Sequence, residues 1–238
     1  MKSTIFVLFL FFISVQASEA QFLKDLFGGG GKSSSNISEK EAEKGIKDAL
    51  LQGIKKGVDN VSEVDGYFKN TAIKIPFPDN VKKVETQLRA LGMNEMVDKA
   101  ILSMNRAAEQ AAKDATPIFV SAIKQLTIQD ALNIVTGQQE DAATQYLQRT
   151  TSDSLTRVFK PTISAALENV NATKYWDDVF TRYNKIPFIK KVNPNLEEYV
   201  TEKAIEGLFH MVAKEEKLIR KDPVARTTDL LKKVFGGK

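Results

Sequence analysis

From residue 37 onward, apolar residues recur at the spacing of an α-helix, and no segment of any length alternates with the period of a strand. The clearest example follows Ser38 and Glu41, whose spacing is typical of a helix capping box. One apolar face then continues at helical spacing through Ala42, Ile46, Ala49, Leu50, Gly53, Ile54, Val58 and Val61. The pattern predicts an all-α fold, with a single compact domain of about eight to ten helices over residues 37–236.

Small residues follow one edge of this first helix at four-residue intervals, at positions Gly45, Ala49, Gly53 and Gly57. A glycine inside a helix costs about 1 kcal/mol relative to alanine. Because a row of small residues lets another helix approach closely, we expect this edge to be buried.

Proline, glycine and capping residues divide the remainder of the domain. Asp65-Gly66 ends the first helix, and the proline-rich residues 73–78 (IKIPFP) are expected to run extended. Pro161 marks either a kink or the start of a new helix. Further helices are expected at about 81–91, 94–108, 118–126, 131–135, 141–152, 153–170, 172–184 and 195–220, with a last one carrying the apolar residues of 230–235. Thr116-Pro117 is expected to cap one of them and Thr127 with Asp130 another.

The first twenty residues have the layout of a secretory signal peptide. Lys2 precedes the apolar run 5–13, and Ser18-Glu19-Ala20 forms a small-x-small cleavage site. The run is shorter than the roughly 20 residues that a membrane-spanning helix needs. We therefore expect cleavage after Ala20 and export, either to the periplasm or out of the cell. Residues 21–36, which contain four glycines and three serines, are expected to form a flexible linker.

Composition narrows the chemistry that the chain can perform. The sequence contains no Cys and one His, which rules out thiol catalysis, zinc–thiolate sites and multi-histidine metal sites. We expect no metal and no cofactor. The formal net charge of +4 is modest and well mixed, without the basic stripe typical of nucleic-acid binding. The expected partner is an envelope protein or a lipid-like ligand, with at most peripheral membrane contact through the amphipathic segments 21–27 and 230–235.

Six polar residues are candidates for ligand binding: Asn105, Arg106, Glu109, Asp153, Arg226 and Asp229. Arg106 and Glu109 are three residues apart on one helix and can pair. Two interpretations remain open, a surface ion pair or an Arg106 that enters a polar cleft and binds an anionic group.

The other candidates lie in two clusters rich in hydroxyls and carboxylates, residues 150–153 and 226–229. Helix capping explains the first cluster, and Arg226 and Asp229 could pair locally or anchor the last helix. Asp153 and Asp229 could in principle perform acid–base chemistry, although no spacing links them. No catalytic residue is assigned.

His210 and the aromatic residues of 175–188 are expected to be structural. His210 lies beside the inward stripe of its helix and is expected at the surface. Trp176, Tyr175, Tyr183, Phe180 and Phe188 are expected in the core, the alternative being the wall of an apolar ligand pocket.

Several short motifs together resemble a known family. They include MNRAAE (104–109), PIF (117–119), DAL (130–132), AATQYL (142–147), YNKIPF (183–188), NPNLEEYVT (193–201), GLF (207–209) and RTTDLL (226–231). The chain resembles, over about residues 38–235, a bacterial exported-protein family known as domain of unknown function 4197. The resemblance implies no activity. Some relatives look like lipoproteins, but this chain lacks the cysteine that such an anchor requires.

Three functional hypotheses follow from these observations. We favour a non-enzymatic binding or structural module of the bacterial envelope that binds a protein, a peptide or a lipid-like ligand. The alternative is a hydrolase or transferase that uses carboxylate and arginine groups in a cleft. A third possibility is a structural protein whose amphipathic ends touch a membrane.

Overall fold

The computed structural model describes residues 39–136, 139–169, 171–186, 188 and 195–221. These residues contain no strand, so the all-α class is confirmed. Among the described residues, the number of helices lies at the lower end of the expected range. The elements are α2 (Glu39–Ser62), the 3-10 helix η1 (Asp79–Val81), α3 (Lys82–Ala90), α4 (Asn94–Ala112), α5 (Ala115–Lys124), α6 (Ile128–Thr136), α7 (Ala142–Asn169), α8 (Ala172–Asn184) and α9 (Leu196–Lys221).

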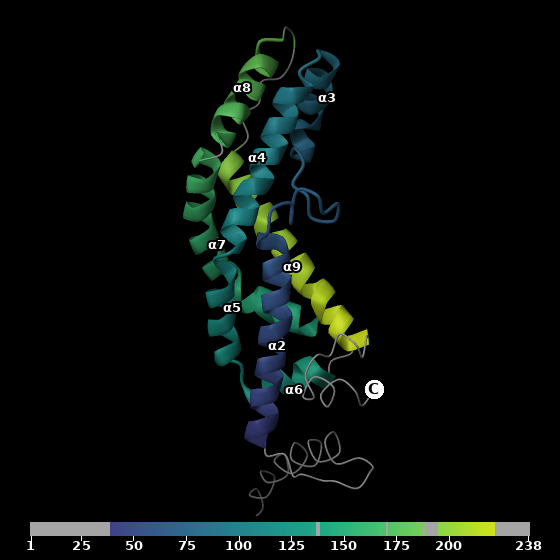
Figure 1. Cartoon of the computed structure of the whole chain (residues 1–238), viewed down its shortest axis with the longest axis vertical. Coiled ribbons are helices and arrows are strands. Elements are labelled where there is room, and N and C mark those ends of the chain that lie inside the picture. The colour runs from purple at the N-terminus through teal and green to yellow at the C-terminus, as the bar shows by residue number, and fades with distance from the viewer. Residues whose placement is uncertain (1–38, 137–138, 170, 187, 189–194, 222–238) are drawn as a thin grey trace, which may run out of the picture.

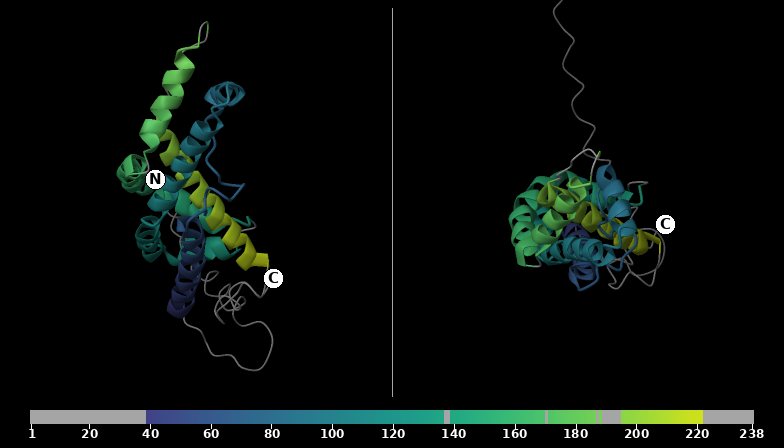
Figure 2. Two further views of the ribbon diagram at one scale, coloured as in Figure 1. Left: turned by 45° about the horizontal axis from the view of Figure 1, so that its top comes forward. Right: turned by 90° about the horizontal axis from the view of Figure 1, so that it is seen from above.

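The helices form an elongated bundle in which α9 runs obliquely through the centre (Figure 1). Helix α9 packs against α2, α4 and α7 and is therefore a central helix of the bundle. In the view along the long axis, on the right of Figure 2, the helices pack together into a rounded cross-section. One continuous hydrophobic core extends from Ile54 on α2 to Val212 on α9, and a smaller cluster lies between α6 and α7.

The predicted close approach at the small residues of α2 is confirmed, and the partner is α9. A Cβ added to Gly57 would lie 3.5 Å from the Cα of Val212, and one added to Gly53 would lie 2.9 Å from Cδ1 of Ile219. Because neither glycine has a side chain, the backbones of α2 and α9 can pack closely along this edge.

The break expected between residues 152 and 153 does not occur, because α7 continues from Ala142 to Asn169. The prediction that the hydroxyl cluster caps a helix is therefore wrong. The Oγ1 atoms of Thr150 and Thr151 donate to the carbonyls of Tyr146 and Leu147, four residues earlier in the same helix, at 2.9 and 2.6 Å. Such bonds satisfy hydroxyls inside a helix without ending it. Pro161 lies within α7 and does not start a new helix.

Two other expected helix starts have different outcomes. The start of α6 is confirmed: Thr127 Oγ1 accepts from the Asp130 backbone N–H at 3.1 Å, and Asp130 Oδ2 accepts from the Thr127 backbone N–H at 3.2 Å. The Thr116-Pro117 cap is wrong, because α5 begins at Ala115. The capping role of Ser38, the linker and the helix expected after residue 223 lie outside the described residues.

The aromatic residues of α8 are mainly in the core, as expected. Trp176, Phe180 and Tyr183 are buried, and the ring of Trp176 stacks on that of Phe77 with 5.3 Å between centroids. Phe188 is instead fully exposed, so its assignment to the core is wrong.

A buried carboxylate that no sequence pattern indicated joins α9 to α7. Glu216 accepts hydrogen bonds from the backbone N–H groups of Ala143 and Thr144, both at 2.9 Å. The first N–H groups of a helix have no partner within that helix, so Glu216 caps α7 from a distant part of the chain. Arg220 binds Glu216 and donates to the carbonyl of Ile134 at 2.8 Å, which adds α6 to the same junction.

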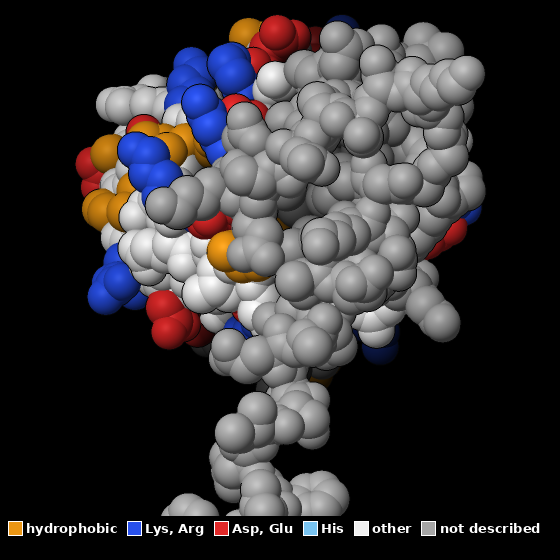
Figure 3. Space-filling view, turned by 90° about the horizontal axis from the view of Figure 1, so that it is seen from below, with side chains coloured by type: hydrophobic (Ala, Val, Ile, Leu, Met, Phe, Trp, Pro, Cys, Tyr) orange, Lys and Arg blue, Asp and Glu red, His pale blue; other side chains and the backbone are white. Residues whose placement is uncertain are grey.

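Within the described residues, no helix combines the length and the apolar character needed to cross a membrane. Seen from below, the visible described surface intersperses Lys and Arg with Asp, Glu and hydrophobic side chains (Figure 3).

Candidate functional site

Residues 63–78 connect α2 to η1 without forming a regular element, and we call this segment the strap. Residues 74–78 run extended, as predicted, whereas Ile73, which was expected to be extended as well, lies in a turn in which its N–H donates to the carbonyl of Asn70. Ile73, Ile75 and Phe77 are buried, whereas Lys74 and Pro76 are exposed. This alternation is the side-chain pattern of a β-strand. The strap has no neighbouring strand, so its backbone polar groups must find other partners.

Asn105 on α4 provides two of these partners. Its Oδ1 accepts a hydrogen bond from the backbone N–H of Ile75 at 2.8 Å, and its Nδ2 donates to the carbonyl of Ile75 at 2.9 Å. Nδ2 also donates to the carbonyl of Ile101 at 2.7 Å. Asn105 is fully buried, and its carboxamide therefore has a structural role in holding the strap.

Glu109, one turn further along α4, holds the first half of the strap. Its Oε1 accepts hydrogen bonds from the backbone N–H groups of Tyr67 and Phe68, both at 3.1 Å. The Tyr67 hydroxyl donates to the carbonyl of Ala204 on α9 at 2.6 Å. Burial raises the pKa of Tyr67, and the negative charge of Glu109 raises it further, so the hydroxyl stays protonated and available as a donor.

Arg106 is bound by two carboxylates. Its Nη1 lies 2.6 Å from Oε2 of Glu109, and its Nη2 lies 2.7 Å from Oδ1 of Asp65 at the start of the strap. Burial lowers the pKa of Arg106, but the hydrogen bonds to Glu109 and Asp65 outweigh it, and the pKa is raised. The hydrogen bonds from Lys69 and then Arg106 lower the pKa of Asp65. The expected Arg106–Glu109 pair is confirmed, and it extends into a network.

Arg106 and Glu109 also line a cavity of about 480 Å³, together with Ser62, Val64, Gln110, Lys113, Asp114 and Thr162. The charged lining residues balance, because Arg106 and Lys113 are matched by Glu109 and Asp114. A site for an anionic group would need an excess of positive charge, which this cavity does not have.

Of the four candidate residues that the structure describes, it brings together three, Asn105, Arg106 and Glu109 on α4. Asp153 lies on the exposed side of α7 and does not line the Arg106 cavity. Arg226 and Asp229 lie outside the described residues.

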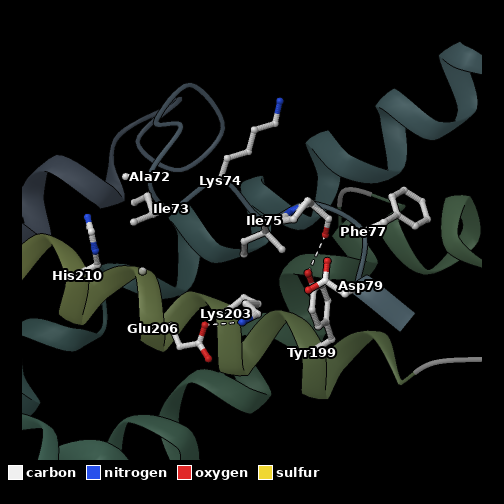
Figure 4. A pocket seen from close by; sticks show the side chains of 12 residues that line it. Ala72, Ile73, Lys74, Ile75, Phe77, Asp79, Tyr199, Lys203, Glu206 and His210 are labelled. Carbon is white, nitrogen blue, oxygen red and sulfur yellow. Dashed lines mark hydrogen bonds and ion pairs between the residues drawn. The ribbon is translucent and has the colours of Figure 1, made fainter. Parts of the chain in front are cut away.

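A second cavity, of about 360 Å³, lies between the strap and α9, and we call it the strap groove (Figure 4). One wall consists of residues 72–77 with Asp79. The other consists of one face of α9, with Tyr199, Lys203, Glu206, Gly207 and His210. His210 is exposed, as expected from its place beside the inward stripe.

Contacts between the two walls fix the shape of the strap groove. The Tyr199 hydroxyl donates to the carbonyl of Pro76 at 2.9 Å. Burial raises the pKa of Tyr199 to about 12, with smaller contributions from Asp79, Glu206 and Glu202. At the other end, a Cβ added to Gly207 would lie 2.6 Å from Cε1 of Tyr67, so only glycine allows this approach of α9 to the strap.

The side chains of the groove are suited to recognition by hydrogen bonds and charge. Lys203 and Glu206 form an ion pair with 2.5 Å between Nζ and Oε2, and the hydrogen bond to Glu206 raises the pKa of Lys203.

Within the described part of the chain, no group of three or more His, Cys, Asp or Glu residues is placed to hold a metal ion.

Sequence reasoning did not identify the strap groove. The signal that was present is the helical spacing of Tyr199, Lys203, Glu206 and His210, which places them on one face of α9. The sequence does not show that residues 72–77 lie opposite this face, because that placement depends on tertiary contacts.

Comparison with known proteins shows the family but adds no activity. No curated protein and no solved structure matches the chain. The model of one family, described as protein of unknown function (DUF4197), matches residues 36–236, which is nearly all of the chain after the linker. The chain belongs to this family, as the resemblance of its motifs indicated.

Proposed function

We propose that this protein is an exported, non-enzymatic binding module, acting in the periplasm or outside the cell, that binds an envelope component in the strap groove. The observation that carries the proposal is the strap itself. An extended segment without a strand partner is fixed by side chains of α4 and α9, and one of its edges lines an open groove.

The number of side chains that hold the strap by hydrogen bonds supports a role in binding. Three side chains bond to backbone groups of the strap, namely those of Asn105, Glu109 and Tyr199. The side chain of Tyr67, which belongs to the strap, bonds to a backbone carbonyl of α9. A segment that is already ordered loses little conformational entropy when a ligand binds, which improves affinity. Binding and catalytic residues are often carried on loops that a rigid scaffold positions.

A binding role is better supported than a hydrolase or transferase. The enzyme hypothesis needed Arg106 and carboxylates to converge on a substrate in a cleft. Arg106 is instead held by Glu109 and Asp65, and Glu109 also holds the strap. The contacts of Arg106, Glu109 and Asp65 therefore indicate that these side chains stabilise the fold.

The remaining parts of the proposal come from the sequence. We propose that residues 1–20 are removed after export, that membrane contact is peripheral and limited to segments 21–27 and 230–235, and that no nucleic acid is bound. Intact-mass measurement of the protein purified from its native envelope tests the first part, with an N-terminus at Gln21 as the expected result. A mass that includes residues 1–20 would contradict it.

Hydrogen exchange tests the groove directly. The purified protein is incubated with a soluble extract of the native envelope, and amide exchange is measured by mass spectrometry. We expect slower exchange in residues 72–79 and 199–210 only. Unchanged exchange there, or protection confined to another surface, would contradict the proposal.

A pair of matched variants controls this experiment. Ala72→Trp places a large side chain in the groove, and Ala165→Trp makes the same change at an exposed position of α7 outside it. We expect Ala72→Trp to abolish the protection and Ala165→Trp to retain it.

A further inference from the structure

We infer that the occupant of the strap groove is an extended stretch of about five residues of a polypeptide. This inference rests on the proposed function and names the chemical class of the ligand. It depends on three properties of the groove, namely its length, the backbone groups along its edge and the charges on its walls.

The lining face of α9 sets the length of the groove. On α9, Tyr199 and His210 mark the ends of the lining face, and at a rise of 1.5 Å per residue they are about 16 Å apart along the helix. On the strap, the extended residues 74–77 span about 10 Å at roughly 3.3 Å per residue, and the turn at Ala72 and Ile73 continues this wall. Figure 4 shows the strap running along α9, with Ala72 and Ile73 towards His210 and Asp79 beside Tyr199. A ligand that fills this length in extended form contains about five residues.

The backbone edge on the groove side offers one acceptor that the described residues leave without a donor. Ile75 directs both its N–H and its carbonyl to Asn105 on α4. In an extended chain the next residues direct theirs to the opposite side, where the carbonyl of Pro76 meets Tyr199. By the same alternation, we place the carbonyl of Lys74 on this side as well. It accepts no hydrogen bond from the described residues, while the Lys74 N–H is already bonded to Asn70.

An edge of this kind is complementary to a peptide N–H. Pro76 has no N–H to offer, so a ligand on this side must donate to the strap. The backbone of an extended peptide presents donors at regular intervals, and pairing of such a chain with an exposed edge is a known mode of peptide recognition. We assign the Lys74 carbonyl as the acceptor for one ligand N–H.

The charges on the walls favour a polypeptide over an acyl chain. Lys203 lies in the groove with Asp79 and Glu206, whereas the Lys74 side chain points away from α9, with its Nζ 4.3 Å from the centroid of the Phe68 ring (Figure 4). Covering the charged groups in the groove with a hydrocarbon chain would remove water from them without supplying hydrogen-bond partners, which is unfavourable. A peptide of mixed charge supplies partners for both signs.

Binding of synthetic peptides tests the inference. A pool of N-acetylated, C-amidated pentapeptides is selected on the full mature chain, and the peptide that binds best is measured by calorimetry. We expect its affinity to fall at least tenfold with Ala72→Trp and to be unchanged with Ala165→Trp. We also expect one N-methylation, at the residue whose N–H meets Lys74, to lower affinity at least tenfold. A pool that yields no peptide sensitive to Ala72→Trp would overturn the inference.

A charge exchange tests the role of the α9 wall. The double variant Lys203→Glu/Glu206→Lys keeps the possibility of an ion pair but exchanges the two charges, and the variant Lys55→Asp/Asp59→Lys does the same for an exposed pair on α2. Peptides selected on the α9 variant should differ in charge from those of the natural sequence, and those selected on the α2 variant should not. Identical selections on all three proteins would argue against recognition by the groove.

Treatment of the envelope extract separates failure of this inference from failure of the proposed function. Protection of the groove that disappears when the extract is digested with a protease, which is then inactivated, supports a polypeptide ligand. Protection that survives digestion, or that a chloroform–methanol lipid extract reproduces, would overturn the polypeptide inference and leave the binding function standing. Absence of protection with the undigested extract would contradict the binding function itself.

Discussion

The carboxamide of Asn105 pairs with both backbone groups of Ile75, with 2.8 Å from the Ile75 N–H nitrogen to Oδ1 and 2.9 Å from Nδ2 to the Ile75 carbonyl oxygen. A neighbouring β-strand would make the same two bonds. One side chain of a helix therefore substitutes for a strand and allows an extended segment to lie in a helical protein.

Replacement of Asn105 by leucine should destabilise the protein strongly. The change leaves the N–H and carbonyl of Ile75 buried without partners, and each such loss costs about 1–3 kcal/mol. We expect the free energy of unfolding to fall by about 2–4 kcal/mol in urea denaturation followed by circular dichroism. The control Asn133→Leu, at an exposed position of α6, should change it by less than about 0.5 kcal/mol. Equal effects of the two variants would show that Asn105 does not hold the strap.

Alanine substitutions at two glycines of the core should have opposite effects. At Gly207 the new Cβ would meet Tyr67 Cε1 at 2.6 Å and Ile73 Cβ at 3.2 Å, and both neighbours are fixed in the core. Gly207→Ala should lower the free energy of unfolding by about 1–3 kcal/mol, as is typical of overpacking. At Gly57 the nearest atom is 3.5 Å away, so Gly57→Ala should raise it by up to about 1 kcal/mol through helix propensity. Thermal unfolding of both variants checks the signs, and a stable Gly207→Ala would refute the close packing of α9 on the strap.

Removal of the Glu216 carboxylate should weaken the junction of α6, α7 and α9. Glu216→Ala leaves the first N–H groups of α7 without an acceptor and separates Arg220 from its carboxylate. Breaking a buried pair on one side costs about 3–5 kcal/mol, and we expect a loss in this range in urea denaturation. Glu202→Ala, at an exposed position of the same helix, should have little effect. A small loss with Glu216→Ala would indicate that water replaces the cap.

The contribution of Glu140 to stability should depend on pH in the acid range. Its hydrogen bonds from Lys217 and Lys221 lower the pKa of Glu140 from 4.5 to about 2. Because the pKa is lower in the folded protein than in the unfolded chain, the stabilisation is fully present above pH 4.5 and is lost as pH falls towards 2. The difference in unfolding free energy between the natural protein and Glu140→Gln should shrink across this interval and vanish at its lower end. A difference that stays constant with pH would contradict the ion pairs.

Local sequence patterns predicted much of the fold. The helical spacing of α2, the glycine row that α9 contacts and the reciprocal cap of Thr127 and Asp130 were all visible in the sequence, because they depend on residues within a few positions of one another. The break expected at Ser152 was wrong for a local reason too. Hydroxyls and carboxylates suit helix starts, but hydroxyls can also bond to the preceding turn, and the composition of the cluster does not distinguish the two.

The candidate site was predicted only in part. Arg106 and Glu109 were recognised as a pair, but the sequence did not show that Glu109 would accept two backbone N–H groups of the strap, about 40 positions earlier. From the sequence alone, a polar residue on a helix is interpreted as a surface residue or a ligand-binding residue. A structural role becomes visible only when the segment that packs against it is known.

The sequence by itself determined the class of fold, the helix faces that would be buried and the family. Only the tertiary structure decided that the polar residues of α4 hold the strap, and that the strap groove lies between this segment and α9. The physical reason lies in the range of the interactions. Helix periodicity and capping act within one or two turns, whereas the partner of a buried polar group is chosen by which distant segment folds against it.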